Sequence, residues 1–309
     1  MAVVPRDLNQ FITTEGAVWY IGFDLEEDDV MIFVDGSSLK ELREGTINLI
    51  AGNASLRGYE NGVGSNARFS RPTSLLQREN STWIIADVDN HCLRKVEQKT
   101  QIVDDFLGVC TQMSNPPVVE QNGLVTMNKP YGLIVDKFNE KKIYISQILS
   151  VWSLNTENFE IVEVFQDYAH GHGDRQFTLM AWYRHYLLVT TEHTILRLNF
   201  STGAGHPNNA HYTFNSHKIE WINSYQHYRN YPEGVNSFQA IEECGIEGVF
   251  AVADNRNSAI LFIDFYYDLI TPIIPIQANF MYYSPDIKSL YLGFEGFIGV
   301  LPSKFYYSI

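Results

Sequence analysis

The sequence predicts an all-β protein, a single-domain six-bladed β-propeller built from four-stranded antiparallel blades. Three observations predict this fold. The chain has 309 residues, of which 45% are hydrophobic and 14% aromatic, so it can bury a large core. Short apolar stretches of strand length alternate with polar turn residues. Finally, groups of about four such stretches recur along the chain, which is the pattern of propeller blades.

The clearest blade lies within residues 49–110. Its strands and turns read, in order, "TSLLQ", the polar turn "RENST", "WIIAD", "HCLRKVE", the turn "QKT" and "QIVDDFLGV". Four short strands in about forty residues are what one blade requires. Gly62 and Gly64 precede them in a loop, where glycine permits backbone angles that other residues resist.

This stretch resembles an NHL repeat. The first half of that family's pattern, G-x-G-x-x-A-x-F-x-x-P, matches Gly62, Gly64, Ala67, Phe69 and Pro72. The second half, V-A-D-x-x-N-x-x-I-R, matches Ile85, Ala86, Asp87, Asn90, Leu93 and Arg94. The resemblance covers residues 47–110 strongly and the rest of the chain in fragments. It implies a propeller in which Phe69 wedges between adjacent blades. We expect Asp87 and Asn90 to bracket a tight turn and bond nearby backbone N–H groups.

Fainter copies of the repeat set the number of blades. The positions equivalent to Asp87 are Asp35, Gln147, Thr191, Asp254 and Phe294, which makes six blades. The predicted blades span residues 11–52, 69–110, 127–167, 177–214, 235–275 and 278–309 of a single domain. A count of five or seven would require one of these assignments to fail.

The stretch "AHGHGD" at 169–174 contains two histidines that can be interpreted in two ways. His170 and His172 are the residue types of a zinc or copper site. However, "GHGDRQF" aligns with "GVGSNARF" at 62–69 after one deletion, which makes the stretch the glycine-rich loop before the fourth blade. We therefore interpret it as a loop. A metal site would need a third ligand from a neighbouring blade.

The cysteines predict a disulfide. Cys92 begins the third strand of the best blade and Cys110 ends the fourth. If the hairpin turns about Gln101, the two residues lie opposite each other, within about 4.5–5.5 Å at Cα and in disulfide range. The alternative is two buried, unbonded cysteines. Cys244 is left over and is either free or available for an intermolecular bond.

Three N-x-S/T sequons, at Asn53, Asn80 and Asn199, fall in predicted turns or strand ends. Together with the disulfide, these glycosylation sites favour an extracellular or secretory-lumen location, with a cytosolic location left open. The N-terminal "MAVVPRDLNQ" does not resemble a signal peptide. An extracellular location therefore requires that the sequence is a mature chain or a trimmed ectodomain of a larger protein. No apolar run approaches the length of a membrane span.

Charge excludes one class of partner and raises one alternative site. The formal net charge of −14 opposes binding to nucleic acid. The acidic stretch "DLEEDDV" at 24–30 has the carboxylates of a calcium loop. Its spacing lacks the regular D-x-D-x-D-G pattern, so we interpret it as an exposed hairpin tip.

The widest interval between repeat positions contains an aromatic insertion, "EWINSYQHYRNYPEG" at 220–234. Its candidate binding residues are Trp221, Tyr225, His227, Tyr228 and Tyr231. Side chains of these types serve as binding hot spots and sugar-stacking platforms. The alternative is a lid packed on the propeller. A second long, proline-containing loop at 108–123 is expected to line the same rim.

These features predict a non-enzymatic recognition module that binds a protein or glycan partner through its rim loops. No catalytic centre, metal site or cofactor is predicted. The first alternative is a metal-dependent lyase or hydrolase with its site in the central tunnel, because some NHL-like propellers, such as peptidyl amidating lyases and paraoxonase relatives, are enzymes; their histidine ligands do not map onto this sequence. The second is a cytosolic NHL adaptor that binds RNA, which the charge of −14 opposes.

Overall fold

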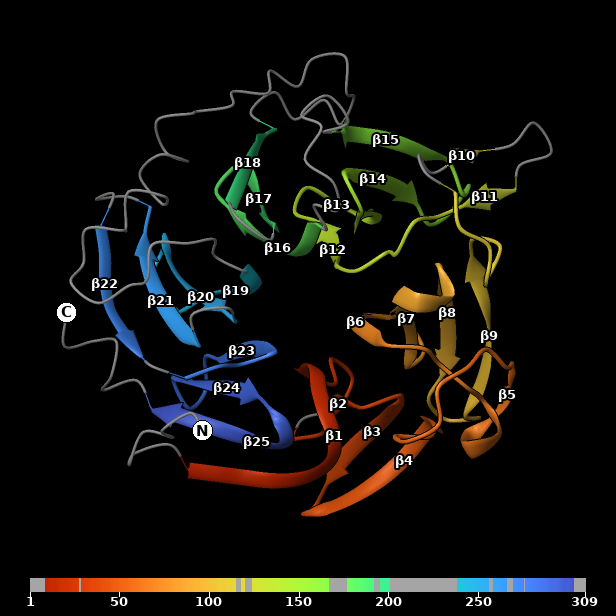
Figure 1. Cartoon of the computed structure of the whole chain (residues 1–309), viewed down its shortest axis with the longest axis horizontal. Helices are drawn as coiled ribbons and strands as arrows, with labels where there is room; N and C mark the ends of the chain where they lie inside the picture. The colour runs from red at the N-terminus through yellow and green to blue at the C-terminus, as the bar shows by residue number, and fades with distance from the viewer. Residues whose placement is uncertain are drawn as a thin grey trace. The chain divides into compact units, whose positions relative to one another are not determined.

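The computed structural model describes residues 9–27, 29–114, 118–119, 124–166, 177–191, 195–200, 238–255, 258–265, 269–274 and 276–302. The chain forms two compact units. The N-terminal unit comprises Gln10–Leu133 and Gly293–Gly299, and the C-terminal unit comprises Met1–Asn9, Ile134–Leu292 and Val300–Ile309. Both are built from small antiparallel sheets (Figure 1). The predicted all-β class is therefore confirmed, whereas the number of blades stays a prediction.

The N-terminal unit contains two principal sheets. The first has β1 (Asn9–Phe23), β2 (Met31–Asp35), β3 (Ser38–Arg43) and β4 (Thr46–Gly52) in sequence order, with β25 (Glu295–Pro302) beside β1. The second has the order β5-β9-β8-β7-β6, with β5 (Gly62–Val63), β6 (Pro72–Arg78), β7 (Thr82–Asp87), β8 (Cys92–Glu97) and β9 (Ile102–Leu107). A short hairpin joins β10 (Val118–Val119) to β11 (Val125–Thr126).

The C-terminal unit repeats the same pattern. One sheet has β12 (Leu133–Asp136), β13 (Asn139–Gln147), β14 (Ser150–Asn155) and β15 (Ile161–Gln166). The next has β16 (Phe177–Tyr183), β17 (Tyr186–Thr191) and β18 (Ile195–Asn199). A third has β19 (Phe238–Glu243), β20 (Val249–Asp254), β21 (Ala259–Asp264) and β22 (Leu269–Ile274). Two further neighbouring strands, β23 (Phe280–Ser284) and β24 (Ser289–Gly293), come after this sheet in the chain and are not part of it.

The second strands of the predicted repeats end close to where the sequence placed them. Strands β2, β7, β13, β17 and β20 end at Asp35, Asp87, Gln147, Thr191 and Asp254. The last, β24, ends at Gly293, one residue before the predicted position. Before these ends, β2 and β7 carry continuous apolar runs, Met31–Val34 and Trp83–Ala86, because both faces of these strands are buried, so the alternation of a half-exposed strand is missing.

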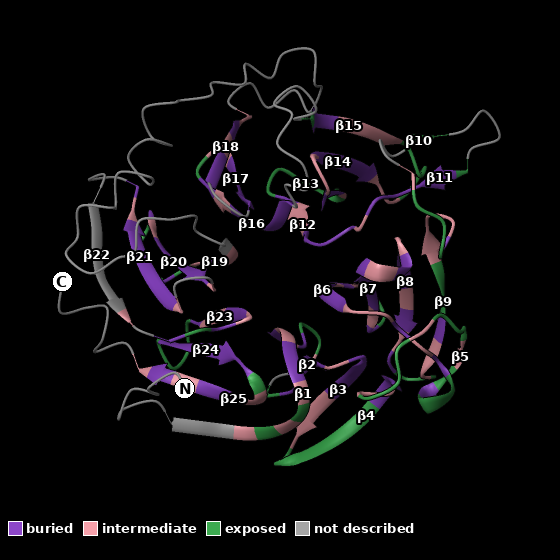
Figure 2. Cartoon of the chain, viewed as in Figure 1, coloured by how far each residue is buried: buried purple, intermediate pink, exposed green. Residues whose placement is uncertain are grey.

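Burial decreases from the second strand of a sheet to the fourth. All five residues of β2 are buried, whereas the first four residues of β4 are exposed (Figure 2). Ile47 and Leu49 are apolar members of that exposed stretch. The apolar core therefore lies around the inner strands, and the outer strand presents its first half to solvent.

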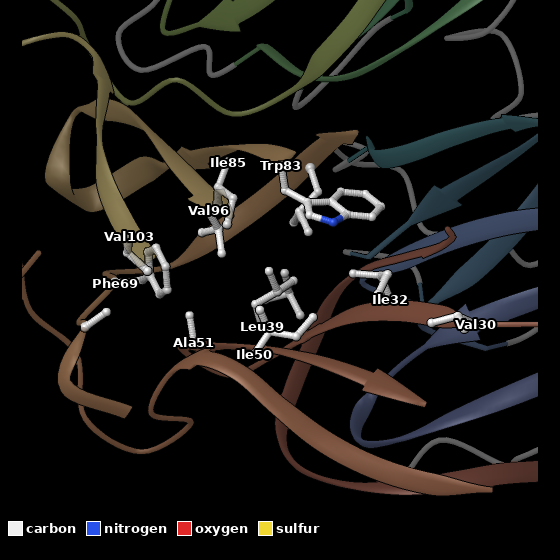
Figure 3. Packing of buried hydrophobic residues seen from close by; sticks show 13 residues of the cluster. Val30, Ile32, Leu39, Ile50, Ala51, Phe69, Trp83, Ile85, Val96 and Val103 are labelled. Atoms are coloured by element: carbon white, nitrogen blue, oxygen red, sulfur yellow. The ribbon is translucent and has the colours of Figure 1, made fainter. Parts of the chain in front are cut away.

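Phe69 packs between the two principal sheets of the N-terminal unit. Its ring is fully buried, with Val96 and Val103 on one sheet and Ala51 on the other (Figure 3). Burial of one large apolar side chain stabilises the fold by about 2–3 kcal/mol. Gly52 has a φ of +85°, and a Cβ there would lie 2.8 Å from the Phe69 ring, so the position requires glycine. The expectation that Phe69 wedges between blades is thus confirmed for these two sheets.

Asp87 joins the end of β7 to the segment that precedes β6. Its Oδ1 accepts a hydrogen bond from Ser70 N at 2.7 Å, and its Oδ2 accepts one from Asn90 Nδ2 at 2.8 Å. Asn90 also donates to the carbonyl of Gly58. Asp87 thus bonds a backbone N–H group as expected, and that group belongs to Ser70 ahead of the repeat. Asn90 differs from the expectation, because its amide donates to the Gly58 carbonyl and to Asp87.

Arg94 on β8 completes this buried network. Its side chain is inaccessible to solvent, and Nη1 lies 3.2 Å from Asp87 Oδ2. The guanidinium also donates to the carbonyls of Arg68 and Glu60, at 3.2 and 3.1 Å. It lies 4.9 Å from the centre of the Tyr59 ring, within cation–π range. A planar group with five donors suits this position, since one cation binds several acceptors of the loop.

Candidate functional site

The loop that follows β9 is fastened at its base. Gly108 has a φ of +96° and turns the chain out of the strand. Two residues later Cys110 is disulfide-bonded to Cys92, with 5.0 Å between the Cα atoms. Val109 N donates to Val125 O at 2.9 Å, and Thr111 N donates to Asn90 O at 2.7 Å. The loop therefore leaves the sheet from a fixed starting point.

The disulfide was predicted correctly, but the register behind the prediction is wrong. Residues on β8 and β9 pair as Glu97 with Ile102 and Leu93 with Leu107, with a shift between Leu93 and Arg94. Strand β9 ends at Leu107, so Cys110 is not a strand residue. The turn at Gly108 brings Cys110 back to Cys92, and glycine makes that turn available.

Apolar side chains are exposed on this anchored loop. Met113 is 60% exposed and Leu124 is 49% exposed, with Val118 and Val119 of the β10 strand between them. Met113 also forms an isolated bridge with Met127, which is buried. We name Met113, Val118, Val119 and Leu124 the apolar loop surface. Apolar side chains grouped on one loop are typical of a contact surface for another molecule.

The aromatic candidates of the insertion lie outside the described residues. Trp221, Tyr225, His227, Tyr228 and Tyr231 all fall within 201–237. His170 and His172 fall within 167–176, which is likewise outside the described part of the chain. Both hypotheses stay predictions.

In the acidic stretch 24–30, Asp24, Glu26 and Glu27 bind other residues of the protein, whereas Asp29 is exposed as expected of a hairpin tip. Asp24 is buried, and its Oδ1 accepts hydrogen bonds from Gln77 Nε2 and Glu26 N. Glu26 accepts hydrogen bonds from the backbone N and the hydroxyl of Ser81, which lower its pKa. Within the residues that the structure describes, no group of three or more His, Cys, Asp and Glu side chains is arranged to hold a metal ion.

The sequons occupy a turn and two strand ends. Asn80 is exposed in the turn between β6 and β7. Asn53 follows β4, and its Oδ1 accepts hydrogen bonds from the backbone N of Ser55 and of Leu56, so this amide is already engaged. Asn199 is the last residue of β18 and is half-buried. Asn80 is thus the most accessible of the three, and glycosylation at each stays a prediction.

Two buried titratable groups lie near the end of β19. Cys244 is free and fully buried, and burial raises the pKa of its thiol, so it is neither accessible for an intermolecular bond nor reactive. Of the two alternatives left open by the sequence, the free thiol is found. Glu242 accepts a hydrogen bond from Tyr283 N at 3.1 Å, and desolvation raises its pKa to about 8. Among the described residues no helix has the length and apolar character to cross a membrane.

Comparison with known proteins gives a fold and no family. No family model matches the chain, and no curated protein matches its sequence. A gluconolactonase from Xanthomonas campestris is similar in structure, with a TM-score of 0.61 and 12% identity over 96% of this chain and 88% of that one. Streptogramin B lyase gives a TM-score of 0.54 and 12% identity over 95% and 96% of the two chains.

The extracellular domain of a hybrid two-component system from B. thetaiotaomicron is also similar, with a TM-score of 0.56 and 11% identity over 96% of this chain. This chain spans only 39% of that domain's length. Identities this low show the fold alone, and the fold they support is the β-propeller. The similar structures include enzymes and an extracellular domain, so the fold does not choose between those functions.

Sequence reasoning identified the loop at 108–123 but not its contact residues. Met113 and Leu124 are ordinary apolar residues in a polar stretch, and only the structure shows that they are exposed. The reasoning also missed three basic side chains, Arg71, His91 and Lys129, which the structure brings together. A signal was present, because Arg71 and Lys129 each precede the repeated proline, in "SRP" and "NKP".

Proposed function

We propose that this chain is a non-enzymatic recognition module of the NHL type, working outside the cell or in the secretory lumen. It binds a protein or glycan partner through the loops at the rim of its sheets. The observation that carries the proposal is the apolar loop surface on a loop fastened by the Cys92–Cys110 disulfide. The disulfide fixes the base of the loop before a partner binds, which lowers the conformational entropy lost at that end on binding.

Three further observations support the location. Disulfides form and persist in oxidising compartments and are rare in the cytosol. Asn80 is exposed in a turn within an N-x-T sequon, as a glycan acceptor must be. One of the similar structures is an extracellular domain. Trp221, Tyr225, His227, Tyr228 and Tyr231 are proposed to extend the binding surface.

The location is tested by the intact mass of the natively expressed protein, measured without reduction and with and without deglycosylation. We expect a bridged Cys92–Cys110 pair and glycan mass at Asn80. A fully reduced chain without glycan would contradict the location.

The binding surface is tested by replacing Met113 and Leu124 together with serine. The variant and the wild type are compared on arrays of secreted proteins and of glycans. We expect the variant to lose its array partner and keep its thermal unfolding temperature, because both side chains are exposed. Leu25→Ser is the matched control, since Leu25 is 83% exposed at the β1–β2 hairpin. If the control loses as much binding to the partner as the test variant does, the apolar loop surface is not the binding surface.

A further inference from the structure

Two segments of the N-terminal unit, each leading into the first strand of a repeat, place basic side chains beside each other. The segment before β12 runs along the start of β6, where Thr73 Oγ1 donates to Tyr131 O at 2.8 Å and Leu133 N donates to Ser74 Oγ at 3.0 Å. Arg71 precedes the first of these segments and Lys129 precedes the second. The parallel run of the two segments brings these two residues to the same end.

A third nitrogen-bearing side chain joins them from the turn after β7. His91 Nδ1 accepts a hydrogen bond from Lys129 N at 3.2 Å. A neutral imidazole that accepts at Nδ1 carries its proton on Nε2, which is therefore a donor. Burial lowers the pKa of His91, and the positive charges of Lys129 and Arg71 lower it further. The charges of Lys129 and Arg71 thus both act on the His91 ring, and the Asp89 carboxylate opposes them.

The backbone holds these residues in a conformation that side chains disfavour. The φ angles of Arg71, His91 and Lys129 are +60°, +59° and +48°. Arg71 and Lys129 each precede a proline rather than occupying a hairpin turn, where such angles are common. Left-handed backbone at residues with a Cβ is costly, and it often marks a functional site.

The cluster keeps unused binding capacity. Arg71 Nη2 lies 3.1 Å from Asp89 Oδ1, but Nε and Nη2 of Arg71 make no hydrogen bond in the described part of the chain. A carboxylate that reached Nε and Nη2 would give these two buried donors the hydrogen-bond partners that they lack. Lys129 Nζ has no ion pair with any described residue. Arg71, Lys129 and Asp89 sum to a local charge of +1, in a chain whose formal net charge is −14.

We propose that Arg71, His91 and Lys129 form a binding site for a carboxylate, supplied by an acidic segment of a protein partner. Guanidinium, imidazole N–H and ammonium groups are the donors that a carboxylate accepts from. The half-buried position of all three side chains strengthens such contacts, because solvent screens them less. The inference rests on the proposed function for the existence of a partner, and it adds the partner's chemistry.

A peptide is favoured over an acidic glycan by the apolar surface beside the cluster. Met127 lies two residues before Lys129, and it bridges to the exposed Met113 of the apolar loop surface. A segment with carboxylates and apolar side chains can occupy both places. An acidic sugar offers carboxylates but little apolar area.

The test uses three probes on the whole chain: glutarate, a peptide of alternating Glu and Leu, and an oligosaccharide of glucuronic acid. Binding is followed through the NMR resonances of the His91 ring. We expect glutarate to shift these resonances and to raise the pKa of His91, since a bound anion favours the imidazolium. We expect the peptide to bind more tightly than glutarate or the oligosaccharide.

Arg71→Gln and Lys129→Gln are each expected to weaken peptide binding about tenfold, by loss of one charge-assisted hydrogen bond. Lys99→Gln is the matched control. It removes the same charge from an exposed residue in the turn at the other end of β8 and is expected to leave affinity unchanged. Thermal unfolding of each variant checks that it is folded.

Three results would overturn the inference. An absence of any probe response on His91 would remove the site. An equal response to sulfate would show a general anion effect, and tighter binding of the oligosaccharide would exclude the peptide. Failure here is separable from failure of the proposed function, because the Met113 and Leu124 variant tests partner binding without these three residues.

Discussion

The two units differ in the residue that faces the end of the second strand of each sheet. In the N-terminal unit the second strand of each principal sheet ends in a buried aspartate, and a cation stands two residues past its paired partner. Asp87 pairs with Cys92 and is bound by Arg94. Asp35 pairs with Ser38 and is bound by Lys40 Nζ at 2.8 Å. The cation and the carboxylate occur together.

In the C-terminal unit the equivalent positions carry apolar side chains. Gln147 pairs with Ser150, and Trp152 stands two residues further on. Asp254 pairs with Ala259, and the next position on that face is Leu261, a member of the buried core. Gln147 is a buried amide, which needs only hydrogen bonds, whereas Asp254 is a buried carboxylate like Asp35 and Asp87 although an apolar residue stands where they have a cation. The comparison shows that one strand geometry accepts either an ionic network or apolar packing.

Arg94→Met gives the largest expected effect. It leaves Asp87 buried without its counter-charge, so we expect the free energy of unfolding at pH 8 to fall by about 3–5 kcal/mol. Urea unfolding measures this loss. The double variant Asp87→Asn with Arg94→Met should recover part of it, because no buried charge is then left unpaired. A loss below about 1 kcal/mol would contradict the network.

The same variant is expected to depend on pH. Burial raises the pKa of Asp87 to about 7, above the value of about 4 in an unfolded chain. The stabilising contribution of this group is full below about pH 4 and is lost as pH rises through about 7. Removing Arg94 should therefore cost less at pH 5, where folded Asp87 is protonated, than at pH 8. An equal cost at both values would show that the carboxylate charge is not involved.

Removal of the disulfide is expected to give the next largest loss of stability. Cys92→Ala with Cys110→Ala removes a bridge between residues 18 positions apart, so we expect unfolding free energy to fall by about 3 kcal/mol. Cys244→Ala in the C-terminal unit is the comparison, since it removes a buried thiol that forms no bond. An equal effect of the two changes in denaturant unfolding would mean that packing, and not the bridge, stabilises the sheet.

Lys40→Met is expected to cost less than Arg94→Met, about 1–2 kcal/mol. Asp35 keeps hydrogen bonds from two backbone groups, Glu15 N at 3.0 Å and Gly16 N at 2.7 Å, whereas Asp87 keeps one from a backbone group and one from Asn90. The Lys40 side chain is also 11% exposed, whereas that of Arg94 is inaccessible. Urea unfolding of the two variants in parallel gives the comparison. A larger loss for Lys40 would reverse our ranking.

Arg184→Gln gives the smallest effect. Arg184 Nε lies 3.1 Å from Glu247 Oε1, but both side chains are well exposed. Exposed pairs of this kind contribute at most about 1 kcal/mol and are screened by salt, so we expect less than about 0.5 kcal/mol in thermal unfolding. A loss as large as that of Lys40→Met would show that pairing, rather than burial, sets the difference between the units.

Strand ends could be predicted from the sequence because their signal is local. Asp35, Asp87 and Asp254 each follow a short apolar run and precede a turn, and the strands end there. The disulfide was also foreseen, although its assumed register was wrong by the shift near Leu93 and the turn at Gly108. Such a shift depends on how the strand packs, and no residue type announces it.

The sequence by itself determined the all-β class and the spacing of the strands, because residue periodicity and turn chemistry act over a few neighbouring residues. Only the tertiary structure decided that Asp87 reaches Ser70 rather than its own turn, and that Arg71, His91 and Lys129 meet. Arg71 and Lys129 are far apart along the chain, and the bond between Thr73 and Tyr131 beside them joins residues separated by 58 positions. Their proximity follows from how the strands lie side by side, which local preferences do not specify.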